Sequence, residues 1–132
     1  MQAFKLTLRV LAAVILVIAS LHALLGHGAE TLLGVPVPLA SAADPSQDSQ
    51  NRFFGMAFAI YAAVLLLASG DPTRYEHVFR FALLAFFAGG VARLVSIATH
   101  GLPAPAIIGL AVVELVAPPV LFVWFRRIQS AA

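Results

Sequence analysis

Arg93 and Glu114 are charged residues that lie inside two consecutive apolar stretches of this sequence. A charged side chain at the centre of a membrane-spanning helix costs roughly 2.5–3.5 kcal/mol on insertion scales. Two such residues of opposite charge on neighbouring helices therefore predict an ion pair inside a helix bundle. The pair could line a polar pocket that binds a proton or an anion, or it could only fix the register of two helices.

His22 and Arg52 are further polar side chains that could join this pair. His22 ends a face of small and apolar residues at three- and four-residue spacing, which is Ala12, Ile15, Ala19, His22 and Gly26. Its ring could accept a proton or contact a ligand, or it could bond to a backbone carbonyl. Arg52 could bind an anionic lipid headgroup, reach Glu114, or anchor the chain to lipid phosphates.

Pro118 and Pro119 remove two backbone donors from the last apolar stretch and should kink it next to Glu114. The freed carbonyls near residues 114 and 115 could accept a hydrogen bond from Tyr61, from water or from a ligand. We therefore expect one pocket, to which the following residues contribute: His22, Arg52, Tyr61, Leu94, Arg93, Ile107 and Glu114. An amphipathic ligand with an anionic or polar head would fit such a pocket.

Catalytic and metal-binding motifs are absent from the sequence. It contains no Ser-His-Asp spacing, no phosphate-binding glycine loop and no HExxH motif. It also has no cysteine, which excludes disulfides and thiol chemistry. A zinc site could be imagined from His22, His27, His100 and Glu114, but no two of these have a metal-binding helical spacing. We therefore predict no metal and no cofactor, and nothing favours an enzyme.

The composition indicates that the chain is dissolved in lipid. Of the 132 residues, 61% are hydrophobic and 11% are charged, whereas soluble domains carry about 25% charged residues. So few charges could not cover the surface of a soluble protein of this length. The net charge of +2, with no basic cluster interleaved with aromatics, argues against nucleic acid as a partner.

Four apolar segments, at about residues 4–26, 53–69, 78–99 and 105–125, have lengths that suit membrane-spanning helices. Open sheet edges are not viable in hydrocarbon, so we predict an all-α fold. The expected architecture is a single-domain, left-handed four-helix transmembrane bundle with up-down-up-down topology. The basic start followed by an apolar run resembles a signal peptide, but its cleavage pattern is poor, and we expect a retained first helix.

The basic residues predict the orientation in the membrane. One side is flanked by Lys5, Arg9, Arg74, Arg80, Arg126 and Arg127, and the other only by Arg52. Both termini should therefore be cytoplasmic, in a bacterial inner membrane, with the loop at 27–50 facing outward. Prolines in this loop argue against regular helix there, and Asn51 is expected to cap the second helix.

Small residues on the third helix form two rows at four-residue spacing, Ala85-Gly89-Arg93 and Ala88-Ala92-Ser96. Such rows let helix backbones approach closely in lipid. We expect them to pack within the bundle in preference to forming a dimer face.

Four segments carry a resemblance to a known family. They are Arg52-Phe53-Phe54-Gly55, the run from Gly89 to Ser96, His100-Gly101-Leu102-Pro103, and Glu114-Leu115. With these segments the chain resembles, over nearly its whole length, a small bacterial membrane family known as domain of unknown function 4345. The resemblance implies four spanning helices and no established activity.

The leading functional hypothesis is a non-enzymatic membrane component. It would be an accessory or assembly subunit with a membrane protein partner, or a module that binds a lipid or a quinone-like ligand, and it could form oligomers. The competing hypothesis is a proton-coupled small-molecule transporter that uses Arg93, Glu114 and His22. A transporter needs a polar path from both faces, whereas the inner halves of three of the helices are nearly uniformly apolar. A lipid-modifying enzyme is a third alternative.

Overall fold

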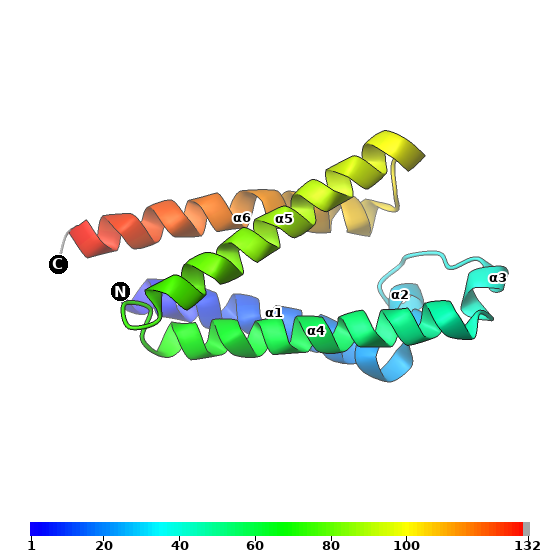
Figure 1. Cartoon of the computed structure of the whole chain (residues 1–132), viewed down its shortest axis with the longest axis horizontal. Helices are drawn as coiled ribbons and strands as arrows, with labels where there is room; N and C mark the ends of the chain where they lie inside the picture. The colour runs from blue at the N-terminus through cyan, green and yellow to red at the C-terminus, as the bar shows by residue number, and fades with distance from the viewer. Residues whose placement is uncertain (131–132) are drawn as a thin grey trace.

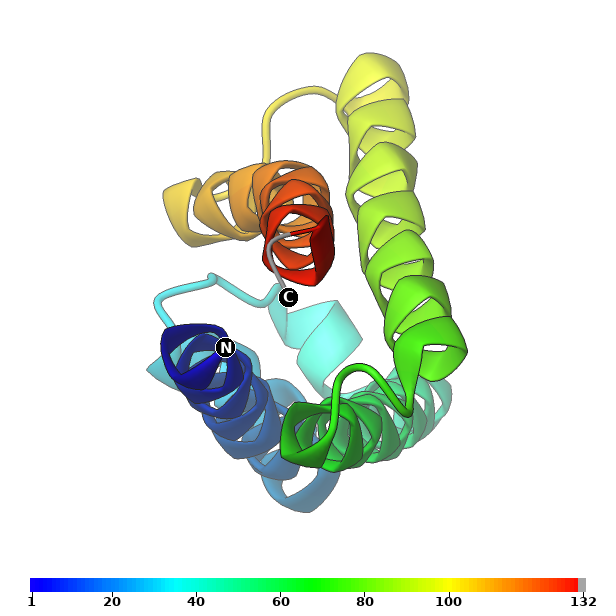
Figure 2. The ribbon, with the colours of Figure 1, turned by 90° about the vertical axis from the view of Figure 1, so that its left-hand side faces the viewer.

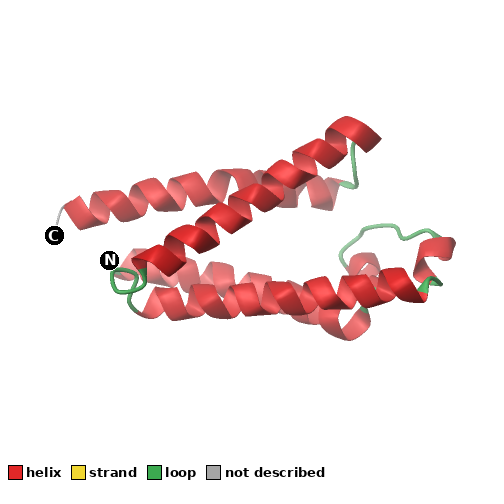
Figure 3. Cartoon of the chain, viewed as in Figure 1, coloured by secondary structure: helices red, strands yellow, loops and turns green. Residues whose placement is uncertain are grey.

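The computed structural model describes residues 1–130, and over these residues the chain is helical with no strand. The helices are α1 (Gln2–Leu25), α2 (His27–Leu32), α3 (Leu39–Ala42), α4 (Pro45–Gly70), α5 (Glu76–His100) and α6 (Pro105–Ser130). Short loops join them (Figure 3). The four longest, α1, α4, α5 and α6, are each long and apolar enough to cross a membrane. The predicted all-α class, with four helices suited in length and composition to span a membrane, is therefore confirmed.

The four long helices are arranged as two pairs. α1 packs along α4 and α5 packs along α6, while contacts between α4 and α5 are fewer. Successive long helices run in opposite directions, so both termini lie at the same end of the molecule (Figure 1). A view along the bundle from this end shows α1 beside α4 and α6 beside α5 (Figure 2). The two pairs diverge toward the opposite end, which carries α2 and α3.

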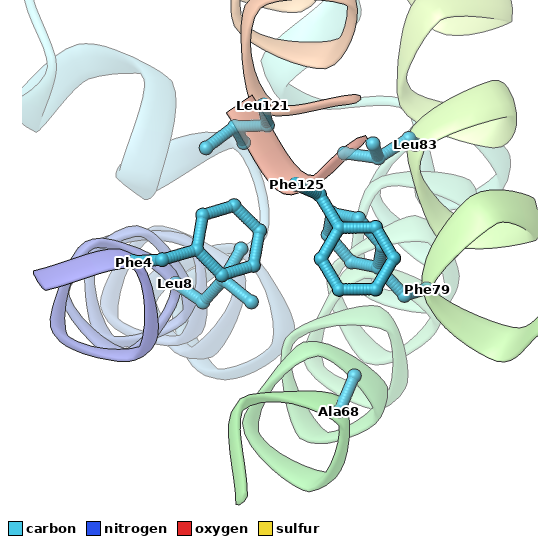
Figure 4. Close-up of a cluster of buried hydrophobic side chains, with 7 residues drawn as sticks. All are labelled: Phe4, Leu8, Ala68, Phe79, Leu83, Leu121 and Phe125. Atoms are coloured by element: carbon cyan, nitrogen blue, oxygen red, sulfur yellow. The ribbon is translucent and has the colours of Figure 1, made fainter. Parts of the chain in front are cut away.

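An aromatic cluster joins the two pairs at the end where the termini lie. Phe4 of α1 packs edge-to-face on Phe79 of α5, with ring centroids 5.6 Å apart, and stacks on Phe125 of α6 at the same distance. All three rings are fully buried, and the cluster also contains the buried side chains of Leu8, Ala68, Leu83 and Leu121 (Figure 4). Each such aromatic pair contributes about 0.5–1.5 kcal/mol beyond its buried area. This cluster, hereafter the Phe4 cluster, unites all four long helices.

Two glycines allow close approach within the pairs. A Cβ atom on Gly55 of α4 would lie 2.5 Å from the backbone nitrogen of Ala23 and 2.9 Å from the carbonyl oxygen of Ala19. A Cβ on Gly90 of α5 would lie 2.8 Å from Cγ of Leu115 on α6. At Gly55 the neighbours are backbone atoms, which cannot move aside, so α1 and α4 meet there with almost no side chain between them.

The loop predicted at 27–50 is in large part helical, so that prediction is wrong. α2 and α3 lie within it, and α4 begins at Pro45, well before residue 53. Proline is well suited to the first turn of a helix, where its missing N–H is not needed. The helix is capped by Asp44, whose carboxylate accepts a hydrogen bond from the Ser46 nitrogen at 2.8 Å. Asn51 lies inside α4 and is therefore not the cap.

The small-residue rows on α5 do not pack inside the bundle as predicted. Apart from Arg93, their members Ala85, Ala88, Gly89, Ala92 and Ser96 are exposed. The buried face of α5 instead consists of Phe79, Ala82, Leu83, Phe86 and Gly90. In lipid, helix association is driven by van der Waals packing, and the rings of Phe79 and Phe86 make far more such contacts than an alanine could. The large side chains therefore decide which face of α5 points inward.

Candidate functional site

Arg93 of α5 and Glu114 of α6 form the predicted ion pair. The Arg93 Nε donates to Oε2 of Glu114 at 2.6 Å, and Nη2 donates to Oε1 at 3.1 Å. The Glu114 side chain is 2% exposed and the Arg93 side chain 30%. Two parallel charge-assisted hydrogen bonds hold the guanidinium in one plane. The pair thus joins α5 to α6 one turn from the close contact at Gly90.

A cavity of about 550 Å³ lies between the two helix pairs, beyond the Phe4 cluster. Its volume falls within the range of about 300–1,000 Å³ that is common for ligand sites. Its polar lining consists of His22, Glu30, Asn51, Arg93 and Glu114. Its apolar lining includes Ile15, Ile18, Phe54, Phe58, Phe86, Ile107 and Leu110. The cavity therefore combines apolar walls with several groups that form hydrogen bonds.

His22 lines the cavity, and its ring bonds to its own helix. Its Nδ1 lies 2.9 Å from the carbonyl oxygen of Ile18. Because a carbonyl oxygen only accepts hydrogen bonds, Nδ1 must carry a proton in this contact. In a neutral ring Nε2 is then left as an acceptor. The His22 ring is thus bonded to a backbone carbonyl, which was one of its two expected roles. Its other ring nitrogen is left free for a ligand.

Arg52 and Tyr61 lie outside the cavity lining, contrary to the expected convergence. Arg52 donates to Asp48 at 2.7 Å and to the carbonyl oxygen of Leu24 at 2.7 Å. The last carbonyls of a helix lack intrahelical partners and carry partial negative charge. Arg52 therefore caps the C-terminal end of α1 and does not reach Glu114.

Tyr61 of α4 has a packing role. Its hydroxyl donates to the carbonyl oxygen of Ala82 on α5 at 2.9 Å, and its ring stacks on Phe86 with centroids 5.6 Å apart. The expected hydrogen bond to carbonyls near residues 114 and 115 is therefore not formed. Leu94 is 48% exposed and also lies outside the cavity lining, whereas Ile107 lies within it as predicted.

Glu30 and Asn51 line the cavity but were not predicted from the sequence to do so. The Asn51 Nδ2 donates to Oε1 of Glu30, and Nδ1 of His27 lies 3.4 Å from Oε2 of the same carboxylate. This links α2 to α4 on the wall of the cavity opposite the ion pair. The three-residue spacing of His27 and Glu30 is typical of one helix face and could have indicated α2. The early start of α4, which places Asn51 opposite α2, had no comparable signal.

The imagined zinc site does not form. His27 is engaged with Glu30, Glu114 with Arg93, and Nδ1 of His100 with the Thr99 hydroxyl at 2.6 Å. Within the described part of the chain, no group of three or more His, Cys, Asp or Glu side chains is placed to hold a metal ion.

The fold and the cavity together define a class: a small helical protein with four helices long and apolar enough to span a membrane, a buried ion pair and a partly polar cavity. The chain belongs to the family described as Domain of unknown function (DUF4345), whose sequence model matches residues 3–125. The resemblance noted from the sequence is thereby confirmed. The matched residues include every residue that lines the cavity. No curated protein and no solved structure matches the chain.

Proposed function

We propose that this protein binds a lipid or a quinone-like molecule in the cavity between its helix pairs and has no catalytic role. The observation that carries the proposal is the cavity itself, which has extensive apolar walls and a small set of polar groups. Ligand sites generally have this composition, because apolar contacts supply affinity and a few polar groups fix orientation. An amphipathic molecule from the bilayer matches both parts of the lining.

Arg93 is the best-placed group to contact the head of such a ligand. A guanidinium has five N–H donors, and two of them are used by Glu114. Three donors are left on a side chain that is partly exposed and lines the cavity. The bidentate contact with Glu114 holds these donors in place, so little conformational entropy is lost when a ligand binds. The ligand head should therefore carry hydrogen-bond acceptors.

The Phe4 cluster favours binding over transport. A transporter that used Arg93, Glu114 and His22 would need a polar path through both halves of the bundle. Buried aromatic and aliphatic side chains from all four long helices fill the half near the termini. An accessory or assembly role in a larger membrane complex is compatible with lipid binding and would add a protein partner.

We also propose a bacterial inner-membrane location with both termini in the cytoplasm. The starts of α1 and α5, the turn between α4 and α5, and the end of α6 lie at one end of the molecule (Figure 1). These segments contain Lys5, Arg9, Arg74, Arg80, Arg126 and Arg127. An excess of basic residues marks the cytoplasmic side, which supports this orientation.

Native mass spectrometry of the detergent-purified protein tests the proposed ligand binding. We expect one bound lipid or quinone per chain. Ala106 also lines the cavity, so Ala106→Trp would place an indole there and should reduce the bound fraction at least about tenfold. Ala88→Trp is the matched control, since Ala88 is exposed on α5 and lies outside the cavity lining. Equal ligand retention by both variants, or no retention by the unaltered protein, would refute the proposal.

A further inference from the structure

Resting on the proposed lipid-binding function, we infer that the cavity selects a zwitterionic head with a phosphate and a primary ammonium, as in an ethanolamine phospholipid. Two oppositely charged side chains with unused hydrogen-bonding capacity line the same cavity. Arg93 belongs to the α5–α6 pair and Glu30 to α2, which is linked to α4. Glu114 orients the Arg93 guanidinium, and Asn51 orients the Glu30 carboxylate. Both charged groups therefore have a defined direction before a ligand binds.

The phosphate would bind at Arg93. A planar guanidinium matches the oxygens of a phosphate, and such hydrogen bonds are among the stronger ones in proteins. Because Glu114 already fixes one edge of the guanidinium, the other N–H groups have a defined direction. The same carboxylate compensates the arginine charge when the cavity is empty.

The ammonium would bind at Glu30 and Asn51. The Glu30 carboxylate accepts from Asn51 through Oε1 and lies near His27 through Oε2, and its side chain is 28% exposed. An ionised carboxylate offers about four acceptor sites, so further N–H donors can be accommodated. The Oδ1 atom of Asn51 is buried and has no hydrogen-bond partner within residues 1–130. An ammonium group with its three N–H donors would donate to the unused acceptor sites of Glu30 from the cavity, which Glu30 and Asn51 both line.

Other head groups fit this lining less well. With neutral histidines the polar lining contains two carboxylates, Glu30 and Glu114, and one guanidinium. An anionic head without an amine would place its charge beside an excess of negative charge. A quinone carbonyl could accept from Arg93, but it has no donor for Glu30 or for Asn51. Of these three heads, only the zwitterion supplies an anion to one wall and N–H donors to the other.

Competition in native mass spectrometry tests this inference. The delipidated protein is mixed with equal amounts of phosphatidylethanolamine, phosphatidylglycerol and a ubiquinone, the two lipids carrying the same acyl chains. We expect phosphatidylethanolamine to exceed each competitor by about tenfold, the size of effect typical of a hydrogen bond to a charged group. Equal binding of the two phospholipids, or a preference for the quinone, would overturn the inference while leaving the proposed binding function intact. Failure to bind any of the three would refute that function itself.

The Glu30→Gln variant tests whether Glu30 binds the ammonium group. Glutamine keeps an acceptor for Asn51 but loses the charge, so the preference for phosphatidylethanolamine should fall to about equal binding. Glu76→Gln is the matched control, because Glu76 lies at the opposite end of the bundle, where it accepts a hydrogen bond from Gln129 at 2.8 Å. The Glu76→Gln protein should keep the preference for phosphatidylethanolamine unchanged. A Glu30→Gln protein that kept the tenfold preference would overturn the inference.

Water-soluble glycerophosphoethanolamine distinguishes a lipid from a free solute. It carries the same head without acyl chains, so at the lipid concentration it should give no adduct, because the apolar walls contribute much of the binding. Adduct formation by this solute at the level of the lipid would overturn the assignment to a membrane lipid.

Discussion

The Arg93–Glu114 pair allows a prediction in which the two single substitutions have unequal effects. Arg93→Met leaves a carboxylate that is 2% exposed without its donors. Breaking a buried pair in this way typically costs about 3–5 kcal/mol. Glu114→Gln leaves the charge on an arginine that is 30% exposed and keeps one acceptor for it. Partial exposure reduces the penalty, so we expect a smaller loss of about 1–3 kcal/mol.

Replacing both partners should restore much of the loss. Arg93→Met combined with Glu114→Leu removes both charges and leaves apolar side chains of similar length on α5 and α6. Such replacements of buried ion pairs are often nearly neutral or stabilising. The double variant should therefore be more stable than Arg93→Met alone, and its coupling energy should be clearly non-additive.

Unfolding in detergent, followed by circular dichroism as a denaturing detergent is added, measures these differences. The reasoning would be refuted if Arg93→Met were as stable as the unaltered protein, or if the double variant lost the sum of the two single losses. Lipid retention measured on the same variants separates architecture from function. If the stable double variant still binds lipid, the pair only holds α5 against α6; if it no longer binds lipid, the pair is part of the binding site.

Three further predictions concern packing, capping and topology. Gly55→Ala should destabilise the protein by about 1–3 kcal/mol through overpacking, whereas Gly109→Ala, where an added Cβ has no neighbour within 4 Å, should not; detergent unfolding compares the two. The backbone hydrogen bond from Ser46 lowers the pKa of Asp44 below its ordinary value of 3.8. The ionised Asp44 carboxylate therefore stabilises the start of α4 above that pH, and this stabilisation is lost as the pH falls through the lowered pKa. Asp44→Asn should abolish this acid-dependent change at the start of α4, measured by hydrogen exchange of the first turn. A reporter enzyme active only in the periplasm should be inactive when fused to Ala132 and active when inserted after Gly34; activity of the Ala132 fusion would refute the orientation.

Hydropathy alone was enough to predict the class of fold. A run of about 20 apolar residues can satisfy its backbone hydrogen bonds in lipid only as a helix, so four such runs predict four spanning helices wherever they pack. The same energetics identified the Arg93–Glu114 pair, since each charge would be costly in hydrocarbon without the other. These conclusions depend on local composition and on the solvent, and they needed no knowledge of the tertiary structure.

Which side chains line the cavity could be learned only from the tertiary structure. The polar first turns of α4 carry no hydropathy signal, so the position of Asn51 opposite Glu30 became visible only with the helix in place. Arg52 could have reached Glu114, lipid or α1, and the carbonyls at the end of α1 lie nearest. The inward face of α5 was decided by where Phe79 and Phe86 could be buried, which depends on the partners that α1, α4 and α6 supply. Composition predicts which segments are helical, but which side chains meet across a cavity is set by helix register and close packing, and these are properties of the whole bundle.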